Sequence, residues 1–111
     1  MNVYDTANKL AEELKKAPEY LEFKKAKEKV NQNPEEKKRI EEFEKLRYEA
    51  QVLSIQKGEQ DAEKIKKLQE LYQMLLENPD MKEYFDLEVR FNVLLADVNK
   101  IIGEAVKDVL Q

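Results

Sequence analysis

Residues 79–110 read PDMKEYFDLEVRFNVLLADVNKIIGEAVKDVL, and this stretch decides the fold. Its apolar residues recur every third or fourth position, which places them on one face of an α-helix. The opposite side also carries apolar residues between about 89 and 98, as expected of a helix that packs on two sides. The main stripe consists of Tyr84, Leu87, Phe91, Leu94, Leu95, Val98, Ile101, Ile102, Ala105 and Val109, and the far side carries Val89, Val93 and Ala96.

The length of this helix predicts self-association. At 1.5 Å per residue it would extend for about 45 Å, whereas a compact globule of this chain length is about 35 Å across. A long apolar face that water would otherwise wet is most often covered by a second copy of the chain. We therefore predict a homo-oligomer, dimer or tetramer, whose interface comprises Tyr84, Leu87, Phe91, Leu94, Leu95, Val98, Ile101 and Ile102, with Phe91, Leu95, Val98 and Ile102 at its energetic centre.

Prolines divide the rest of the chain into helices. Pro18, Pro34 and Pro79 each stand beside acidic residues, and proline followed by acids is typical of a first helical turn. Asn33 and Asn78 directly precede two of these prolines and are predicted N-caps. The predicted helices span residues 2–16, 18–32, 34–57, 60–77 and 79–110.

Gly58 separates two amphipathic segments, 34–57 and 60–77, which we expect to form the arms of a helical hairpin. The chain of 111 residues has the length of one ordinary domain, and its scarcity of glycine, with 2 residues, is typical of long helices, so we predict a single helical domain over residues 1–111. The predicted fold class is all-α: an elongated bundle of about five helices that self-associates through its long C-terminal helix.

The composition excludes several kinds of chemistry. The chain has no cysteine and no histidine, so disulfides, thiol nucleophiles, cysteine-ligated zinc or iron-sulfur clusters and histidine bases are absent. Its 24 acids and 20 bases alternate closely and give a net charge of -4, which favours solubility. Neither a signal peptide nor a membrane-spanning segment is apparent, and we expect a cytoplasmic protein.

Carboxylates are the remaining candidates for catalysis or metal binding. Glu88, Asp97 and Glu104 lie in the most apolar helix, where paired acids could transfer protons or hold a hard cation. The spacing of seven from Arg90 to Asp97 and from Asp97 to Glu104 instead favours a charged flank beside an interface. We predict no catalytic residue, no cofactor and no metal, and therefore no enzyme.

Two further patterns bear on partners. Asn92 and Asn99 are also seven apart, and asparagine at such positions can fix the register of packed helices or face solvent. The basic clusters at 24–27, 37–39 and 64–67 are interrupted by glutamates, so no continuous positive face for nucleic acid is predicted.

The whole chain resembles the YheA-type branch of the YlbF/YmcA family, small helical proteins of Gram-positive bacteria. The residues that carry the resemblance are Tyr4-Asp5-Thr6-Ala7-Asn8-x-Leu10, Glu19-Tyr20 with Phe23, Ala26 and Val30, then Phe43, Gln51 and Gly58, and Asp97-Val98 with Ile101-Ile102.

The resemblance implies a self-associating helical bundle and a non-enzymatic regulator. Relatives act in complexes that control competence, sporulation and biofilm formation, and they influence messenger-RNA processing by associating with a ribonuclease. Relatives also supply cysteines to iron-sulfur clusters, a cofactor that this cysteine-free chain cannot hold in that way. We therefore predict a protein-protein interaction or regulatory protein with a further protein partner. The alternatives are an RNA-processing accessory protein that contacts a ribonuclease or RNA, and a carboxylate-based metal-dependent enzyme.

Overall fold

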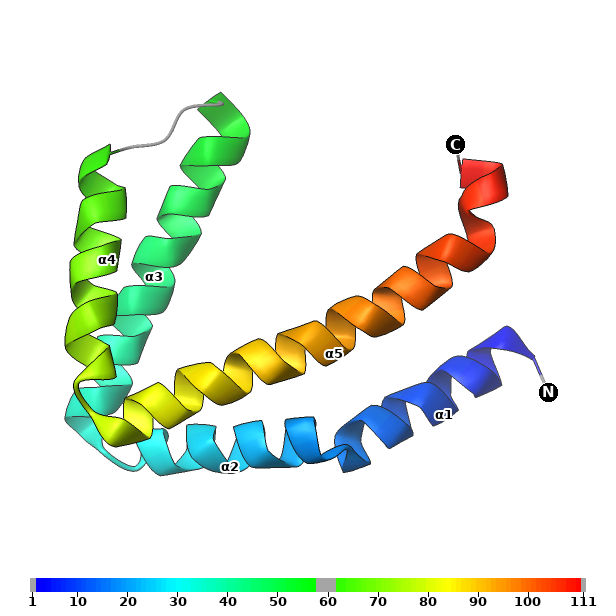
Figure 1. Cartoon of the computed structure of the whole chain (residues 1–111), viewed down its shortest axis with the longest axis horizontal. Coiled ribbons are helices and arrows are strands. Elements are labelled where there is room, and N and C mark those ends of the chain that lie inside the picture. The colour runs from blue at the N-terminus through cyan, green and yellow to red at the C-terminus, as the bar shows by residue number, and fades with distance from the viewer. Residues whose placement is uncertain (1, 58–61, 111) are drawn as a thin grey trace. The chain divides into compact units, whose positions relative to one another are not determined.

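The computed structural model describes residues 2–57 and 62–110, which form five α-helices and no strand (Figure 1). This confirms the all-α fold with five helices. The helices are α1 (Val3–Lys16), α2 (Pro18–Asn31), α3 (Pro34–Lys57), α4 (Ala62–Leu76) and α5 (Pro79–Leu110). The expected break at Gly58 and the expected helix start at residue 60 lie outside the described residues.

Asparagine side chains cap three of the helix starts. The Asn2 Oδ1 atom accepts a hydrogen bond of 2.9 Å from the backbone N–H of Asp5 at the start of α1. Asn33 caps α3 by accepting from the backbone N–H of Glu35, and Asn78 caps α5 by accepting from that of Asp80. Each cap satisfies an N–H group that has no partner inside its helix. The predicted caps Asn33 and Asn78 are confirmed.

The chain forms two compact units. The first combines residues up to 27 with residues from 84 onward, and the second comprises residues 28–83. Whether residues 1–111 behave as the predicted single domain stays a prediction.

In the second unit, α3 and α4 pack side by side as predicted for the arms of a hairpin (Figure 1). The Phe43 ring is buried and stacks on Tyr72 with 5.7 Å between ring centroids, while the Arg47 guanidinium lies 5.3 Å from the Phe43 centroid. Such contacts add to the free energy gained by removing the ring from water. The buried apolar residues of this unit are Val30, Ile40, Phe43, Leu75 and Met81.

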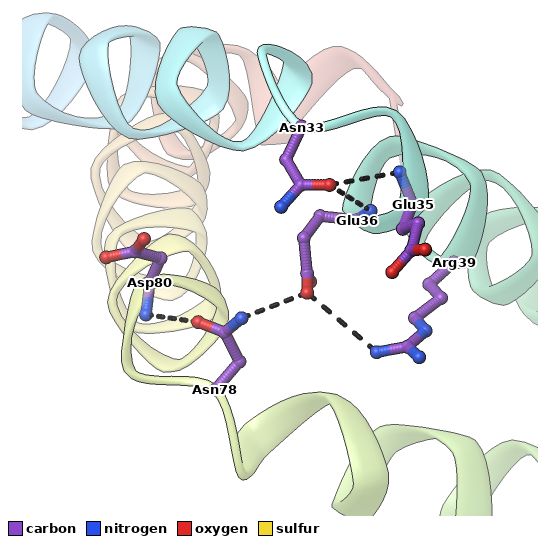
Figure 2. A network of polar contacts seen from close by, with 6 residues as sticks. All are labelled: Asn33, Glu35, Glu36, Arg39, Asn78 and Asp80. Atoms are coloured by element: carbon purple, nitrogen blue, oxygen red, sulfur yellow. Dashed lines mark hydrogen bonds and ion pairs between the residues drawn. The ribbon is translucent and has the colours of Figure 1, made fainter.

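A polar network joins two helix starts within the same unit (Figure 2). The Asn78 Nδ2 atom donates to Glu36 Oε1 at 3.0 Å, and the same carboxylate lies 3.8 Å from Arg39 Nη1. Asn33 in turn accepts from the backbone N–H of Glu36 at 3.3 Å. Glu36 thereby connects the cap of α3 to the cap of α5, although Glu36 and Asn78 are 42 residues apart in the chain.

An ion pair ties the end of α2 to the start of α5. The Lys29 Nζ atom lies 3.1 Å from Asp80 Oδ1. The hydrogen bond to Asp80 and the negative charge of that carboxylate raise the pKa of the Lys29 ammonium above its ordinary value. Both side chains are at least half exposed, so water and salt screen the pair and it contributes little to stability.

Candidate interaction surface

The first half of the α5 stripe is covered by the chain itself. In the first unit, the Tyr20 and Phe23 rings of α2 each lie 5.9 Å from the Phe91 ring, measured between centroids. Phe23 also lies 5.4 Å from Tyr84. Tyr84 and Leu87 are buried, at 3% and 7% exposure. Aromatic packing by α2 therefore accounts for the stripe between residues 84 and 91.

The second half of the same stripe is uncovered. Every residue from 99 to 110 is exposed, including Ile101 at 70%, Ile102 at 51% and Val109 at 77%. These positions continue the three-and-four spacing that begins at Tyr84, so the apolar face of α5 extends beyond the part that α2 covers. We call this surface the exposed stripe; it comprises the exposed Leu95, Ile101, Ile102, Val106 and Val109 and the half-buried Val98 between them.

The predicted interface residues fall into two classes. Tyr84 and Leu87 are buried by their own chain, and Phe91 is half-buried against α2. Leu94 and Val98 are half-buried, whereas Leu95, Ile101 and Ile102 are exposed. The interface itself stays a prediction. Its exposed members are Leu95, Ile101 and Ile102, and the half-buried Phe91, Leu94 and Val98 keep part of their surface accessible.

Val106 belongs to the exposed stripe although it is absent from the predicted interface. It lies four residues after Ile102, and this spacing is the sequence signal that identifies it. Including Val106 and Val109 extends the accessible surface to the last turns of α5.

The far side of α5 is also exposed. Val89 and Val93, which were predicted to face a second packing partner, are both more than half exposed. At the start of α1, Val3 and Tyr4 are exposed as well. The first unit thus carries exposed apolar side chains on the far side of α5 and on α1 as well as in the exposed stripe.

The acidic residues of α5 do not assemble into a recognisable metal site. Asp97 and Glu104 are exposed, Glu88 is half-buried, and Glu104 lies 3.0 Å from Lys107 Nζ in a surface ion pair. Across residues 2–57 and 62–110, no three acidic side chains are grouped so that they could hold a metal ion.

The described helices can also be examined for surfaces that would suit nucleic acid or a membrane. In the basic segment at 24–27 the three lysines are exposed, and so are the flanking Glu22 and Glu28, which keeps the local charge mixed. Within the part of the chain that the structure describes, no helix is both long enough and apolar enough to cross a membrane.

Comparison with known proteins identifies similar sequences over nearly the whole chain. The sequence model of a family described as "Control of competence regulator ComK, YlbF/YmcA" matches residues 3–107. A UPF0342 protein of Caldicellulosiruptor saccharolyticus is 40% identical over 95% of this chain and 88% of its own length. A UPF0342 protein of Symbiobacterium thermophilum is 39% identical over 94% of this chain and 93% of its own length.

Proposed function

The chain belongs to the YlbF/YmcA family, and from that premise we propose that it is a regulatory protein that acts by binding other protein chains. The matched description names control of the competence regulator ComK, which is the regulatory role that the family suggests for this chain. The match does not specify the YheA-type branch.

The observation that carries the proposal is the exposed stripe. Covering an aliphatic side chain of this size completely is worth about 1.5–3 kcal/mol, and Ile101, Ile102 and Val109 are each at least half exposed in the isolated chain. Monomeric proteins rarely leave a contiguous apolar face of this kind in water, and larger exposed patches mark interaction sites. Self-association through α5 would cover the stripe with the same helix of a second copy.

The proposal assigns no catalysis to the chain. Without histidine or cysteine, chemistry would have to rest on carboxylates, lysines or tyrosines. Asp97 and Glu104 of α5 are exposed, and Glu104 is engaged by Lys107. A charged outer flank beside an apolar stripe is the arrangement expected of a helix-to-helix interface.

Two chromosomal variants distinguish binding from catalysis in the native bacterium. We expect Ile102→Asp, which places a charge in the exposed stripe, to reproduce the phenotype of a deletion strain in a reporter of ComK-dependent transcription. We expect the triple variant Glu88→Gln, Asp97→Asn, Glu104→Gln to behave like the wild type, because these acids have no chemical role in the proposal. Immunoblots check that both variants accumulate equally. Loss of regulation by the amide variant with a normal Ile102→Asp strain would contradict the proposal and favour a carboxylate enzyme.

A further inference from the structure

We infer that the exposed stripe pairs with the same stripe of a second copy in an antiparallel arrangement, with the two-fold axis beside residue 100 and Asn99 facing Asn99 of that copy. The inference rests on the proposed self-association and specifies its geometry. It is supported by the spacing of the stripe, by burial within the chain, by the polarity of the flanking residues and by the available area.

The spacing limits the possible registers. The apolar residues of the α5 seam alternate in steps of four and three, at Phe91, Leu95, Val98, Ile102, Ala105 and Val109. In an antiparallel pair, the numbers of two seam residues that face each other add to a constant, and residues that flank the seam meet in pairs whose numbers add to two less or two more than that constant. Apolar layers form only when that constant is near 193, 200 or 207, because other values place seam residues opposite polar ones.

Burial excludes the first register. A constant of 193 would place residues 84–88 opposite residues 105–109 of the second copy. Tyr84 and Leu87 are already buried by their own chain, so they offer no surface to a partner. The same register would also set the Glu88 side chain against Ala105.

The polarity of the flanking residues distinguishes the other two registers. A constant of 207 sets Ile101 beside Asp108 and Asn99 beside Val106 of the second copy, and both contacts join polar to apolar groups. A constant of 200 sets Asn99 beside Asn99 and Ile101 beside Ile101. An asparagine amide both donates and accepts, so two copies facing each other across the axis can exchange hydrogen bonds.

In the register with a constant of 200, contacts between a polar and an apolar residue occur only towards the ends of the overlap. There Asn92 meets Val106 and Leu94 meets Asp108 of the second copy, where water can reach the polar groups. A parallel pair would instead set Leu94 beside Asn99 in the middle of the stripe. It would also align the two helix dipoles, which is less favourable than opposing them.

The surface area that two exposed stripes would bury is large enough for a specific contact between two copies and small enough for that contact to be reversible. The overlap of residues 91–109 is about 27 Å long. At roughly 100 Å² for a fully exposed aliphatic side chain, the exposed stripes of two copies contribute on the order of 600–700 Å² of apolar surface. Because about 60% of an interface is apolar, the total would be roughly 1,000–1,200 Å², at the lower end of specific interfaces.

Spin labels measure the register directly. The full chain has no cysteine, so a single introduced cysteine carries one nitroxide per copy. We expect the label-to-label distance, measured by pulsed electron paramagnetic resonance, to be shortest in Asn99→Cys. In Asn92→Cys and Val106→Cys the labels should be separated by about 15–20 Å more along the helix axis, at 1.5 Å per residue.

A sample that mixes two labelled variants should give a short distance in the same register. When one copy carries its label at Asn92→Cys and the other at Val106→Cys, the distance should be as short as for Asn99→Cys. Equal short distances for all three single variants would indicate a parallel pair and overturn the inference. A shortest distance at residue 92 or 106 would indicate another register and also overturn it.

Light scattering on the same samples separates the inference from the proposed function. A multimeric protein with contradictory label distances refutes the register but leaves self-association intact. A wild-type chain that stays at the 13.2 kDa of one copy refutes both.

Discussion

Replacing Ile102 with aspartate is expected to weaken self-association by at least about 100-fold. Ile102 lies in the innermost layer of the inferred pair and is half exposed in the isolated chain, so a second copy covers what its own chain leaves open. Because the inferred pair is two-fold symmetric, one substitution changes the interface at two places. Loss of apolar burial in both copies, together with two carboxylates removed from water without partners, amounts to about 3 kcal/mol or more, and every 1.4 kcal/mol is about tenfold in Kd.

The matched control is Lys100→Asp. It introduces the same side chain two residues earlier, about 200° around the helix, where it faces away from the stripe. Light scattering over a dilution series should give the mass of one copy for Ile102→Asp and a mass close to that of wild type for Lys100→Asp. Circular dichroism should show equal helix content for the two variants. An Ile102→Asp protein with the wild-type mass would exclude the exposed stripe as the interface.

The substitution with the largest expected effect on stability is Phe43→Ala. Phe43 is only 4% exposed, stacks on Tyr72 and lies beneath the Arg47 guanidinium. Removing a buried phenylalanine leaves a cavity and typically costs about 3–5 kcal/mol. Since small domains are stable by only about 5–15 kcal/mol, the midpoint of urea unfolding should fall sharply or the chain should fail to fold.

Tyr48→Ala on the same helix is the control for this prediction. Tyr48 is 67% exposed, so its removal should change the free energy of unfolding by about 0.5 kcal/mol or less. If both substitutions lowered the free energy of unfolding by the same amount, the burial of Phe43 could not explain the loss of stability in Phe43→Ala.

The helices of this chain could be predicted because their signals are local. Asn33 and Asn78 cap helices through backbone groups two or three residues away, and proline directly after each cap suits the first helical turn. The three-and-four spacing of apolar residues is equally local. These features do not depend on how the helices pack.

Which apolar face of each helix is buried could not be predicted, because burial depends on segments that are far away in the sequence. The α5 stripe has the same pattern on both sides of Phe91, yet α2 aromatic rings cover the earlier part, whereas every residue from 99 to 110 is exposed. Met81 and Phe85 are buried although they do not belong to the predicted stripe. The Glu36 to Asn78 hydrogen bond similarly joins residues that no short-range pattern relates.

The exposed stripe of α5 is proposed to be covered by a second copy of the chain, and the solution mass of the wild-type protein tests this self-association most directly. Light scattering over a concentration series should give at least twice the 13.2 kDa of one chain at high concentration, with a mass that falls on dilution. A constant mass of 13.2 kDa at every concentration would contradict the claim.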